Sequence, residues 1–248
     1  MNKELVKQRF KRKLNSYNEN ARIQQQMAEK LINMITSDFN NTNISILEIG
    51  CGTGLLTELA VEKLEFSKYT ALDIVPECEA FIKNINPDIE FISSDVEEYI
   101  EKNNGKYDII ISNASLQWVE NLPEFVNKLL KRLSPNGRLV FSTFGKENFR
   151  EIYYVLGKTL TYFSKSELEN ILQKHLPQIE EEVRIMAFKT PKEVLKHIQN
   201  TGVNALSQET WTKKDLINFE KEYNSFCANR PTLTYNPIYI AIQNKAQI

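Results

Sequence analysis

The sequence has few cysteines and no long apolar stretch. Its three cysteines, Cys51, Cys78 and Cys227, form no CxxC pair. An odd number without that spacing argues against a disulfide framework and is typical of a reducing compartment. No run approaches the roughly 18 apolar residues of a membrane span, and the opening MNKELVKQRFKRKL lacks the apolar segment of a secretory signal. We therefore expect a cytoplasmic protein with no membrane partner.

The chain also lacks an excess of either charge. Lysine and arginine number 31 against 32 aspartates and glutamates, a formal net charge of -1. No global basic field is present, so we expect no nucleic-acid partner. The first thirty residues nevertheless hold a basic N-terminal patch, made of Lys3, Lys7, Arg9, Lys11, Arg12, Lys13, Arg22 and Lys30. A charge run alone is more often a solvated helix face than a binding surface.

No internal repeat, low-complexity tract or flexible linker divides the sequence. Hydrophobic residues make up 42% of the chain, which is enough for a packed core, and we predict a single domain over 1–248. Short β-rich runs alternate with stretches of helical spacing. The predicted strands are 44–49, 69–74, 89–93, 107–112 and 138–143. This alternation indicates βαβ units and a mostly parallel sheet.

The pattern changes after residue 143. We predict a helical lid over the sheet, then a strand near 181–188, two helices at 191–200 and 213–226, and a final strand at 233–243. Pro237 suggests an edge or a bulge in that last strand. The predicted organisation is an N-terminal helical segment (1–40), a core (44–143), a lid (144–181) and a C-terminal part of the sheet and helices (182–248).

The segment LEIGCGTGLLT contains three of the chain's eight glycines, Gly50, Gly52 and Gly54. They follow a predicted strand and precede a predicted helix, where glycine permits unusual φ angles and lets a ligand approach the main chain. A dinucleotide fingerprint would need glycine where Leu55 stands. EIGCGTG instead resembles motif I of the class I S-adenosylmethionine-dependent methyltransferases, which implies a cofactor-binding core at 44–143 with Glu48 among its contacts. A tight turn without a ligand is the alternative.

Further polar residues follow the next three strands. Asp73 ends the second strand, where a carboxylate can accept both hydroxyls of a ribose, and Ile74 lies beside it. Asp95 is placed to accept from an adenine amino group, with the Val96 amide on a ring nitrogen, and Asn113 closes the fourth strand. Because the carboxyl ends of successive strands form the ligand crevice of an open α/β sheet, we expect one cofactor site here. Each aspartate alone would equally suit a helix N-cap.

Other candidates are less constrained by position. Leu116 and Trp118 in SNASLQW are expected to shape the crevice, Leu116 on the cofactor side and Trp118 on the substrate side, although a large aromatic is more often core. His175 and His197 have no partner at a metal-ligand spacing. We therefore expect surface or capping roles for both histidines, and no metal site.

Ahead of the sheet, one face of a predicted helix carries an apolar stripe that Gln24 interrupts. The stripe is formed by Tyr17, Ala21, Gln24, Ala28, Leu31 and Ile35. A polar side chain on a buried face needs a partner, and the candidates are the carboxylate end of the cofactor or a loop carbonyl. The alternative is that Gln24 lies at the rim of this buried helix face, where water solvates it.

Several flanking segments together resemble one subfamily. They are RFKRKLNSYNENARIQQQMA, ISNASLQWVENL, LVFSTFGKENFREI, TPKEVLKHIQNTGVNAL and the closing LTYNPIYIAI. Over nearly its full length the chain resembles the malonyl-acyl-carrier-protein O-methyltransferases of biotin synthesis. The resemblance implies an α/β fold, namely a seven-stranded Rossmann-like class I methyltransferase sheet, mostly parallel with one antiparallel edge strand, plus N-terminal helices and a helical lid.

The resemblance also implies an activity and a partner. The methyl group of S-adenosylmethionine would pass to the free carboxylate of a malonyl group on acyl carrier protein, with S-adenosylhomocysteine as the second product. Tyr17 would close over the reaction centre, and the basic N-terminal patch would dock the acidic carrier. Family members tend to carry a lid arginine where this chain has Thr161. We therefore expect Lys146, Arg150 or Arg184 to bind the malonyl carboxylate.

Two alternatives stay open. An S-adenosylmethionine-dependent O- or N-methyltransferase of a free small molecule would use the same core without a protein partner, and Thr161 favours it. A non-catalytic cofactor-binding or nucleic-acid-binding module would share the fold, but the near-neutral charge argues against nucleic acid. The lack of a Ser/His/Asp constellation fits carboxyl methylation, because a carboxylate is already ionised near neutral pH.

Overall fold

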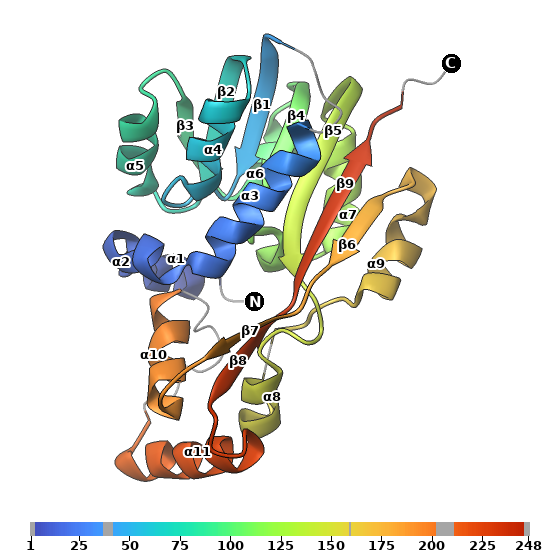
Figure 1. The fold of residues 1–248 in the computed structure, drawn as a ribbon. Helices are drawn as coiled ribbons and strands as arrows, with labels where there is room; N and C mark the ends of the chain where they lie inside the picture. Colours follow the sequence, from blue (N-terminus) through green and yellow to red (C-terminus); the bar gives the residue numbers. More distant parts are fainter. Residues whose placement is uncertain (1–2, 37–41, 159, 202–210, 246–248) are drawn as a thin grey trace.

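A seven-stranded sheet forms the centre of the computed structural model, which describes residues 3–36, 42–158, 160–201 and 211–245 (Figure 1). In spatial order its strands are β3 (Glu90–Ser93), β2 (Phe66–Asp73), β1 (Ile44–Ile49), β4 (Tyr107–Ser112), β5 (Leu133–Phe144), β9 (Pro237–Gln243) and β6 (Gln178–Glu181). Neighbours pair in parallel except at β9, which runs antiparallel to both β5 and β6. The predicted seven-stranded, mostly parallel α/β sheet with one antiparallel strand is confirmed.

The antiparallel strand does not lie at the edge. β9 is one place in from the edge, and the short strand β6 lies outside it. The final predicted strand, 233–243, is two strands, β8 (Thr232–Tyr235) and β9, separated at Asn236. Pro237 is tolerated because it is the first residue of β9, where a missing backbone donor costs least.

Helices cover both faces of the sheet. One face carries α3 (Arg22–Thr36), α4 (Leu55–Lys63) and α5 (Cys78–Ile85), and the other carries α6 (Val96–Lys102), α7 (Leu122–Leu130) and α9 (Lys165–Leu172). In β1, Ile44 and Ile46 join the first core while Leu47 and Ile49 join the second, as the two-residue period of a strand requires. With both faces buried, a ligand can reach the sheet only at the strand ends.

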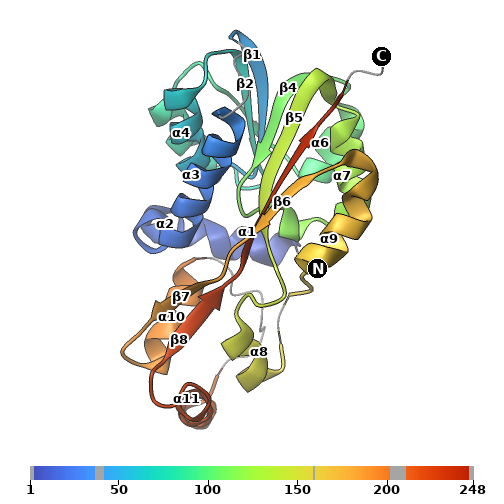
Figure 2. The same cartoon turned by 45° about the vertical axis from the view of Figure 1, so that its right-hand side comes forward.

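The first two helices, α1 (Lys3–Lys11) and α2 (Leu14–Asn20), lie beneath the carboxyl ends of the central strands in both ribbon views (Figures 1 and 2). The predicted stripe from Tyr17 to Ile35 is not one helix, because α2 ends before α3 begins, and α1 precedes both. The Asn20 side-chain amide donates to the Ser16 carbonyl at 2.7 Å, a local bond that competes with helix continuation. The break at Ala21 lets α2 turn across the crevice.

Residues 144–181 are the segment for which the sequence predicts a helical lid. They contain α8 (Arg150–Leu156), α9, the 3-10 turn η2 (Gln173–His175) and strand β6. Leu168 and Leu172 of α9 are buried in the second core, so this helix is part of the sheet's cover. α8 packs against β8 and α11 (Lys213–Phe226) in a lower layer that also holds β7 (Arg184–Ala187) and α10 (Pro191–Asn200) (Figure 2).

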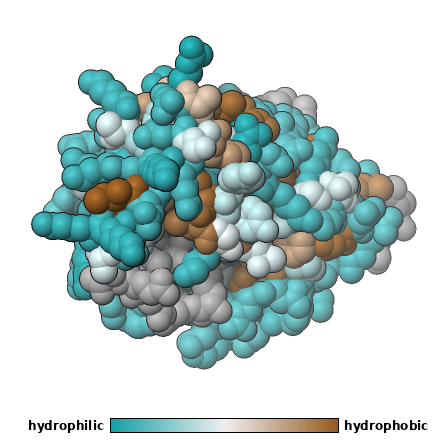
Figure 3. Space-filling model, turned by 90° about the horizontal axis from the view of Figure 1, so that it is seen from below, coloured by the Kyte–Doolittle hydropathy of each residue, from teal (hydrophilic) through white to brown (hydrophobic). Residues whose placement is uncertain are grey.

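The surface at this lower end is mostly hydrophilic, with small hydrophobic clusters (Figure 3). Tyr154 of α8 and Phe226 of α11 are exposed apolar residues, but their rings stack on each other with centroids 4.2 Å apart. In the described ranges, no helix is both long and apolar enough to cross a membrane.

Candidate active site

The strand order reverses between β1 and β4, and such a reversal opens a crevice at the carboxyl ends of the strands. Two cavities lie there, one reaching toward Tyr17 and the other toward Asp95. Both are lined by Val6, Gly50, Asp73, Ile74, Ser115 and Trp118. Because the two cavities share these walls, they form one crevice with two ends.

The glycine loop has the left-handed backbone that the sequence predicted. The φ angles are 69° at Gly50, 54° at Gly52 and 86° at Gly54. Gly50 and Gly52 line the crevice, and a Cβ at Gly50 would overlap the Ser115 hydroxyl. Gly54 lines neither cavity; a Cβ there would overlap the Ile85 side chain. All three glycines therefore let side chains pack closely against the loop, and Gly50 and Gly52 also form part of the crevice wall.

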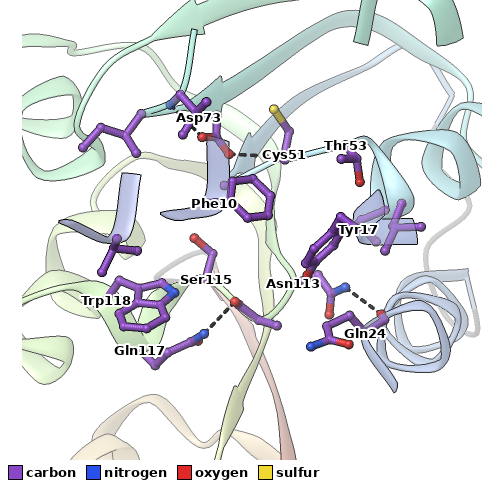
Figure 4. Close-up of a pocket in the computed structure, with 18 of the residues that line it drawn as sticks. Phe10, Tyr17, Gln24, Cys51, Thr53, Asp73, Asn113, Ser115, Gln117 and Trp118 are labelled. Carbon is purple, nitrogen blue, oxygen red and sulfur yellow. Dashed lines mark hydrogen bonds between the residues drawn. The ribbon is translucent and has the colours of Figure 1, made fainter. Parts of the chain in front are cut away.

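Asp73 lies at the junction of the two cavities, across the crevice from Tyr17 (Figure 4). Its Oδ2 accepts from the Gly52 amide at 2.9 Å and its Oδ1 from the Val75 amide at 2.8 Å. Burial raises the pKa of Asp73, and these backbone donors partly oppose that rise. The Cys78 thiol and the Ile74 amide also donate to this carboxylate. Asp73 lines both cavities, at the place where the sequence predicts a ribose.

Asp95 and Val96 line the second cavity, where an adenine was predicted. Asp95 also caps α6, since its Oδ1 accepts from the Glu97 amide at 2.8 Å. Its Oδ2 accepts from the Lys3 ammonium group of α1 at 2.8 Å, and Lys3 pairs with Glu97 as well. This ion pair holds α1 across this end of the crevice. Asp95 therefore caps α6 and also lines the cavity where the sequence predicts the adenine.

Glu48 is a buried carboxyl group that lines the first cavity. Its Oε2 accepts from the Thr57 hydroxyl and from the Tyr69 hydroxyl, each at 2.7 Å. Burial raises the pKa of Glu48 to about 7, against the lowering effect of these two donors. Glu48 therefore titrates near neutral pH, and a cation in the cavity would favour its ionised form.

Gln24 and Asn113 meet at the other side of the first cavity (Figure 4). Asn113 donates to the Gln24 carbonyl at 2.8 Å and accepts from the Ser142 hydroxyl at 2.7 Å, which ties α3 to two strand ends. Gln24 is only 3% exposed, so the solvated rim position is wrong. Its side-chain Oε1 has no partner among the described residues. An orphaned amide oxygen accepts, so it suits an ammonium group better than the predicted carboxylate.

Tyr17 of α2 and Phe10 of α1 lie beside each other in the wall of the crevice (Figure 4). Their rings meet edge to face with centroids 5.1 Å apart. Phe10 lies over the glycine loop, because its Cζ would be 3.1 Å from a Cβ placed on Gly52. Burial, followed by the charge of Asp73, raises the pKa of Tyr17, so its phenol is a neutral hydroxyl. The N-terminal helices α1 and α2 therefore form part of the cover over the crevice.

Comparison with known proteins agrees with this geometry. The family model of the methyltransferase domain matches residues 17–175. A malonyl-[acyl-carrier protein] O-methyltransferase of Chlorobium luteolum is 34% identical, over 99% of this chain and 97% of that protein. One of Bacteroides thetaiotaomicron is 33% identical over 99% of each chain. The chain belongs to the malonyl-[acyl-carrier protein] O-methyltransferase family. The predicted family membership is confirmed.

Solved structures share the fold of this methyltransferase. A methyltransferase-like protein of Bacillus halodurans has a TM-score of 0.62 at 14% identity, covering 88% of this chain and 99% of that one. An N-methyltransferase of Bradyrhizobium japonicum, solved with S-adenosyl-L-homocysteine, has a TM-score of 0.53 at 15% identity, covering 97% and 99%. At such low identity the likeness concerns the fold, and it agrees with the predicted class I methyltransferase architecture.

Not every predicted site residue of the methyltransferase reaches the crevice. Trp118 lines both cavities, but Leu116 is fully buried in the second core and lines neither. The three predicted cations also lie elsewhere, in ion pairs: Lys146 with Glu167 at 2.6 Å, Arg150 with Glu147 at 3.2 Å and Arg184 with Glu182 at 2.6 Å. Each of these flexible side chains finds a carboxylate near its own segment, so none of the three lines the crevice.

The sequence reading missed Lys7, Phe10, Gln117 and Thr201, all of which line the first cavity. Gln117 donates to the Ala114 carbonyl at 2.7 Å, and its buried Oε1 has no partner among the described residues. Because Gln117 lies inside SNASLQW, between Leu116 and Trp118, the sequence could have indicated that it lines the crevice. Phe10 likewise lies inside RFKRKLNSYNENARIQQQMA, whereas nothing in the sequence indicated that the docking of α1 would bring Lys7 to this cavity. Within the described ranges, no cluster of three or more His, Cys, Asp or Glu could hold a metal ion.

Proposed function

We propose that the chain transfers a methyl group from S-adenosylmethionine to the free carboxylate of malonyl-acyl carrier protein. The products are the malonyl methyl ester and S-adenosylhomocysteine, an early step of pimeloyl formation in biotin synthesis. One observation supports this most: the crevice beside the glycine loop has buried oxygen acceptors at Glu48, Asp73 and Gln24 and a neutral phenol at Tyr17. The identity of the acceptor is inferred from the malonyl-[acyl-carrier protein] O-methyltransferases that match nearly the full chain.

The residues present fit the cofactor. Gly50 and Gly52 admit a ligand to the main chain, Asp73 suits a ribose, and Asp95 with Val96 lines the adenine end. Glu48 and the orphaned Gln24 oxygen suit the cationic amino-acid end. When bound, S-adenosylmethionine supplies an electrophilic methyl group on a positively charged sulfur.

The protein needs no general base for this reaction, because a malonyl carboxylate is ionised near neutral pH. No histidine is among the described residues that line the crevice. The chain instead positions the acceptor and excludes water from it. Tyr17, Phe10 and Trp118 enclose the reacting oxygen. A drier site favours a reaction in which opposite charges disappear.

The cofactor's charge leads to a testable pH dependence. The folded-state pKa of Glu48 is raised to about 7, so its carboxylate forms as the pH rises through neutrality. A cation binds the ionised form better, and we expect cofactor affinity to rise about fivefold between about pH 6 and about pH 7.5. Calorimetric titration measures it. Glu48→Gln should remove this pH dependence, and any dependence that remains reports titration of the ligand itself. If the variant kept the wild-type pH profile of cofactor affinity, Glu48 would not be the group that titrates.

The carrier protein is proposed to dock on the exposed part of the basic N-terminal patch. Several of its cations are already paired: Lys3 with Asp95 and Glu97, Lys11 with Glu77, and Lys30 with Glu180 and Glu182. Arg12 is in no ion pair among the described residues, and Lys13 donates to Asn200 at 3.1 Å. Arg12 and the exposed Arg22, neither of which is in an ion pair with a described residue, therefore remain for an acidic partner, whereas Asn200 holds Lys13.

Charge reversal tests this surface. The double variant Arg12→Glu/Arg22→Glu should raise KM for the malonyl carrier about tenfold at low salt and much less at high salt. The same reversal at Lys63 and Lys68, which belong to α4 and the start of β2, should change nothing. Initial rates across a salt series measure both. A KM increase that is equally large for malonyl-coenzyme A would show that the effect is not carrier docking.

The choice of acceptor tests the function itself. Initial rates should be highest with malonyl-acyl carrier protein, lower with malonyl-coenzyme A and lowest with free dicarboxylic acids. Equal or faster turnover of free acids or amines would instead favour the small-molecule methyltransferase. In the view from below, the surface of the described residues is mostly hydrophilic (Figure 3), so recognition of a protein acceptor is expected to depend on charge.

A further inference from the structure

Two buried amide oxygens in the wall of the crevice have no hydrogen-bond partner among the described residues. They are Oε1 of Gln24 and Oε1 of Gln117, and no other buried side-chain oxygen in the described ranges lacks a partner. Both residues line the first cavity. A buried acceptor without a donor carries the cost of its lost hydration, so two of them in one cavity indicate a ligand that brings N–H or O–H groups.

Neighbouring polar groups do have partners. Thr201 also lines the first cavity, and its hydroxyl donates to the carbonyls of His197 and Ile198 at 3.3 and 3.2 Å. His197, which the sequence predicted at the surface, is only 9% exposed, and its Nε2 lies 2.8 Å from the Tyr235 hydroxyl. The chain therefore satisfies its own buried polar groups here, and the two amide oxygens are exceptions that a ligand explains.

The amide of Gln117 is fixed by its own loop. Its Nε2 donates to the Ala114 carbonyl at 2.7 Å (Figure 4). Because a carbonyl can only accept, this bond decides which end of the amide is the nitrogen and leaves Oε1 as the end without a partner. The Ala114 amide in turn donates to the Ser142 hydroxyl of β5 at 2.9 Å. Gln117 is therefore an acceptor whose orientation the sheet holds.

The two oxygens belong to different parts of the first cavity. Figure 4 shows Gln24 beside Asn113 and Gln117 beside Trp118, on opposite sides of the view. Gln117 does not line the second cavity, where Asp95 marks the predicted adenine end. One small group is therefore unsuited to pair both oxygens, and each needs a donor of its own.

The hydrogen-bond donors of S-adenosylmethionine already have acceptors in the proposed function. Its ribose hydroxyls are assigned to Asp73 and its adenine amino group to Asp95, while Glu48 and Gln24 take its ammonium group. The malonyl carboxylate and the thioester carbonyl only accept. Acyl carrier proteins hold acyl groups as thioesters of a pantetheine arm, and its first amide N–H lies two carbons beyond the sulfur. That N–H is the first donor that the acceptor carries beyond its reacting carboxylate.

We propose that Oε1 of Gln117 accepts a hydrogen bond from this first amide N–H, and so selects a malonyl group on a thioester arm over the free acid. This role rests on the proposed carboxyl methylation and deepens it. A site built around a buried acceptor rejects an analogue that lacks the donor, because the oxygen then stays without a partner in the complex. Gln117 is thus a specificity residue for the acceptor and not for the cofactor.

A pair of malonyl thioesters tests this bond. The N-acetylcysteamine thioester carries the amide N–H, and the S-(2-acetoxyethyl) thioester has an ester oxygen in its place and is otherwise the same. The wild-type kcat/KM should be about tenfold higher for the amide than for the ester. A ratio near one, as expected if water paired Gln117 in both complexes, would overturn the proposal whether or not any variant folds.

Two variants locate the acceptor atom. Gln117→Met keeps the length of the side chain without Oε1, and should bring the amide-to-ester ratio close to one while S-adenosylhomocysteine Kd changes less than about twofold. Gln24→Met, the matched control, should keep the ratio near ten and weaken S-adenosylhomocysteine binding about tenfold. A merely structural Gln117 would lower both rates and keep the ratio, and a cofactor contact would weaken S-adenosylhomocysteine binding in Gln117→Met. Either result would overturn the proposal.

Failure of the proposed function would give a different result. If wild type formed no ester from the malonyl carrier or from either thioester, carboxyl methylation would fail. Calorimetry would then give the Kd of each thioester for the S-adenosylhomocysteine complex. Tighter binding of the amide that Gln117→Met abolishes would support the bond to Gln117, and equal binding of the two thioesters would overturn it.

Discussion

Replacing Gly50 with alanine is expected to weaken S-adenosylmethionine binding by at least about 100-fold, or about 2.8 kcal/mol. Gly50 has a φ of 69°, and a Cβ there would overlap the Ser115 hydroxyl at the centre of the crevice. The loop must then shift at the place where the ligand meets the main chain. Calorimetry gives the Kd, and Gly50→Ala/Ser115→Gly should recover part of the loss.

Gly157 supplies the matched control. It has a similar left-handed φ of 63° at the end of α8, but no atom lies within 4 Å of where its Cβ would be. Gly157→Ala should therefore cost about 1 kcal/mol of folding free energy through backbone strain alone and leave cofactor Kd unchanged. Equal losses of affinity in the two variants would show that strain, not the crevice, explains the effect at Gly50.

Removing the hydroxyl of Tyr17 should lower kcat/KM for the malonyl carrier about 100-fold. Tyr17→Phe keeps the ring that packs on Phe10, so S-adenosylhomocysteine Kd should change less than about twofold. The reason is that the hydroxyl orients the acceptor oxygen, whereas the ring only closes the crevice. Steady-state rates and calorimetry on the same preparation measure the two quantities.

Tyr223 is a suitable comparison for Tyr17. It is fully buried, and its hydroxyl donates to the Thr232 carbonyl in the lower layer, away from the crevice. Tyr223→Phe should lower stability by about 1 kcal/mol without changing kcat/KM. Unchanged turnover in Tyr17→Phe would count against the role given to its hydroxyl.

Local patterns in the sequence predicted most of the sheet. The strands 44–49 and 107–112 were placed to the residue, as were the helices 191–200 and 213–226, because apolar periodicity and turn residues act over short distances. The glycine loop was predicted for the same reason. Its φ angles follow from residues a few positions away, whereas its place at the β1–β4 reversal depends on pairing with a strand that is distant in the sequence.

Contacts between distant segments were harder to predict. The sequence placed a lid at 144–181, but α9 there is amphipathic and becomes part of the sheet's cover, while α1 reaches the crevice through its Lys3–Asp95 ion pair. Nothing near His197 in the sequence indicates that its ring will lie within hydrogen-bond distance of the Tyr235 hydroxyl. Segment 202–206, the end of one resembling motif, lies outside the described residues.

Incubation of the protein with methyl-labelled S-adenosylmethionine and malonyl-acyl carrier protein, followed by mass spectrometry of the carrier, is the most direct measurement. The expected result is one labelled methyl ester on the malonyl carboxylate, lost in Gly50→Ala and reduced in Tyr17→Phe. Cofactor binding without label on the malonyl group, or label on the carrier polypeptide itself, would contradict carboxyl methylation at this crevice.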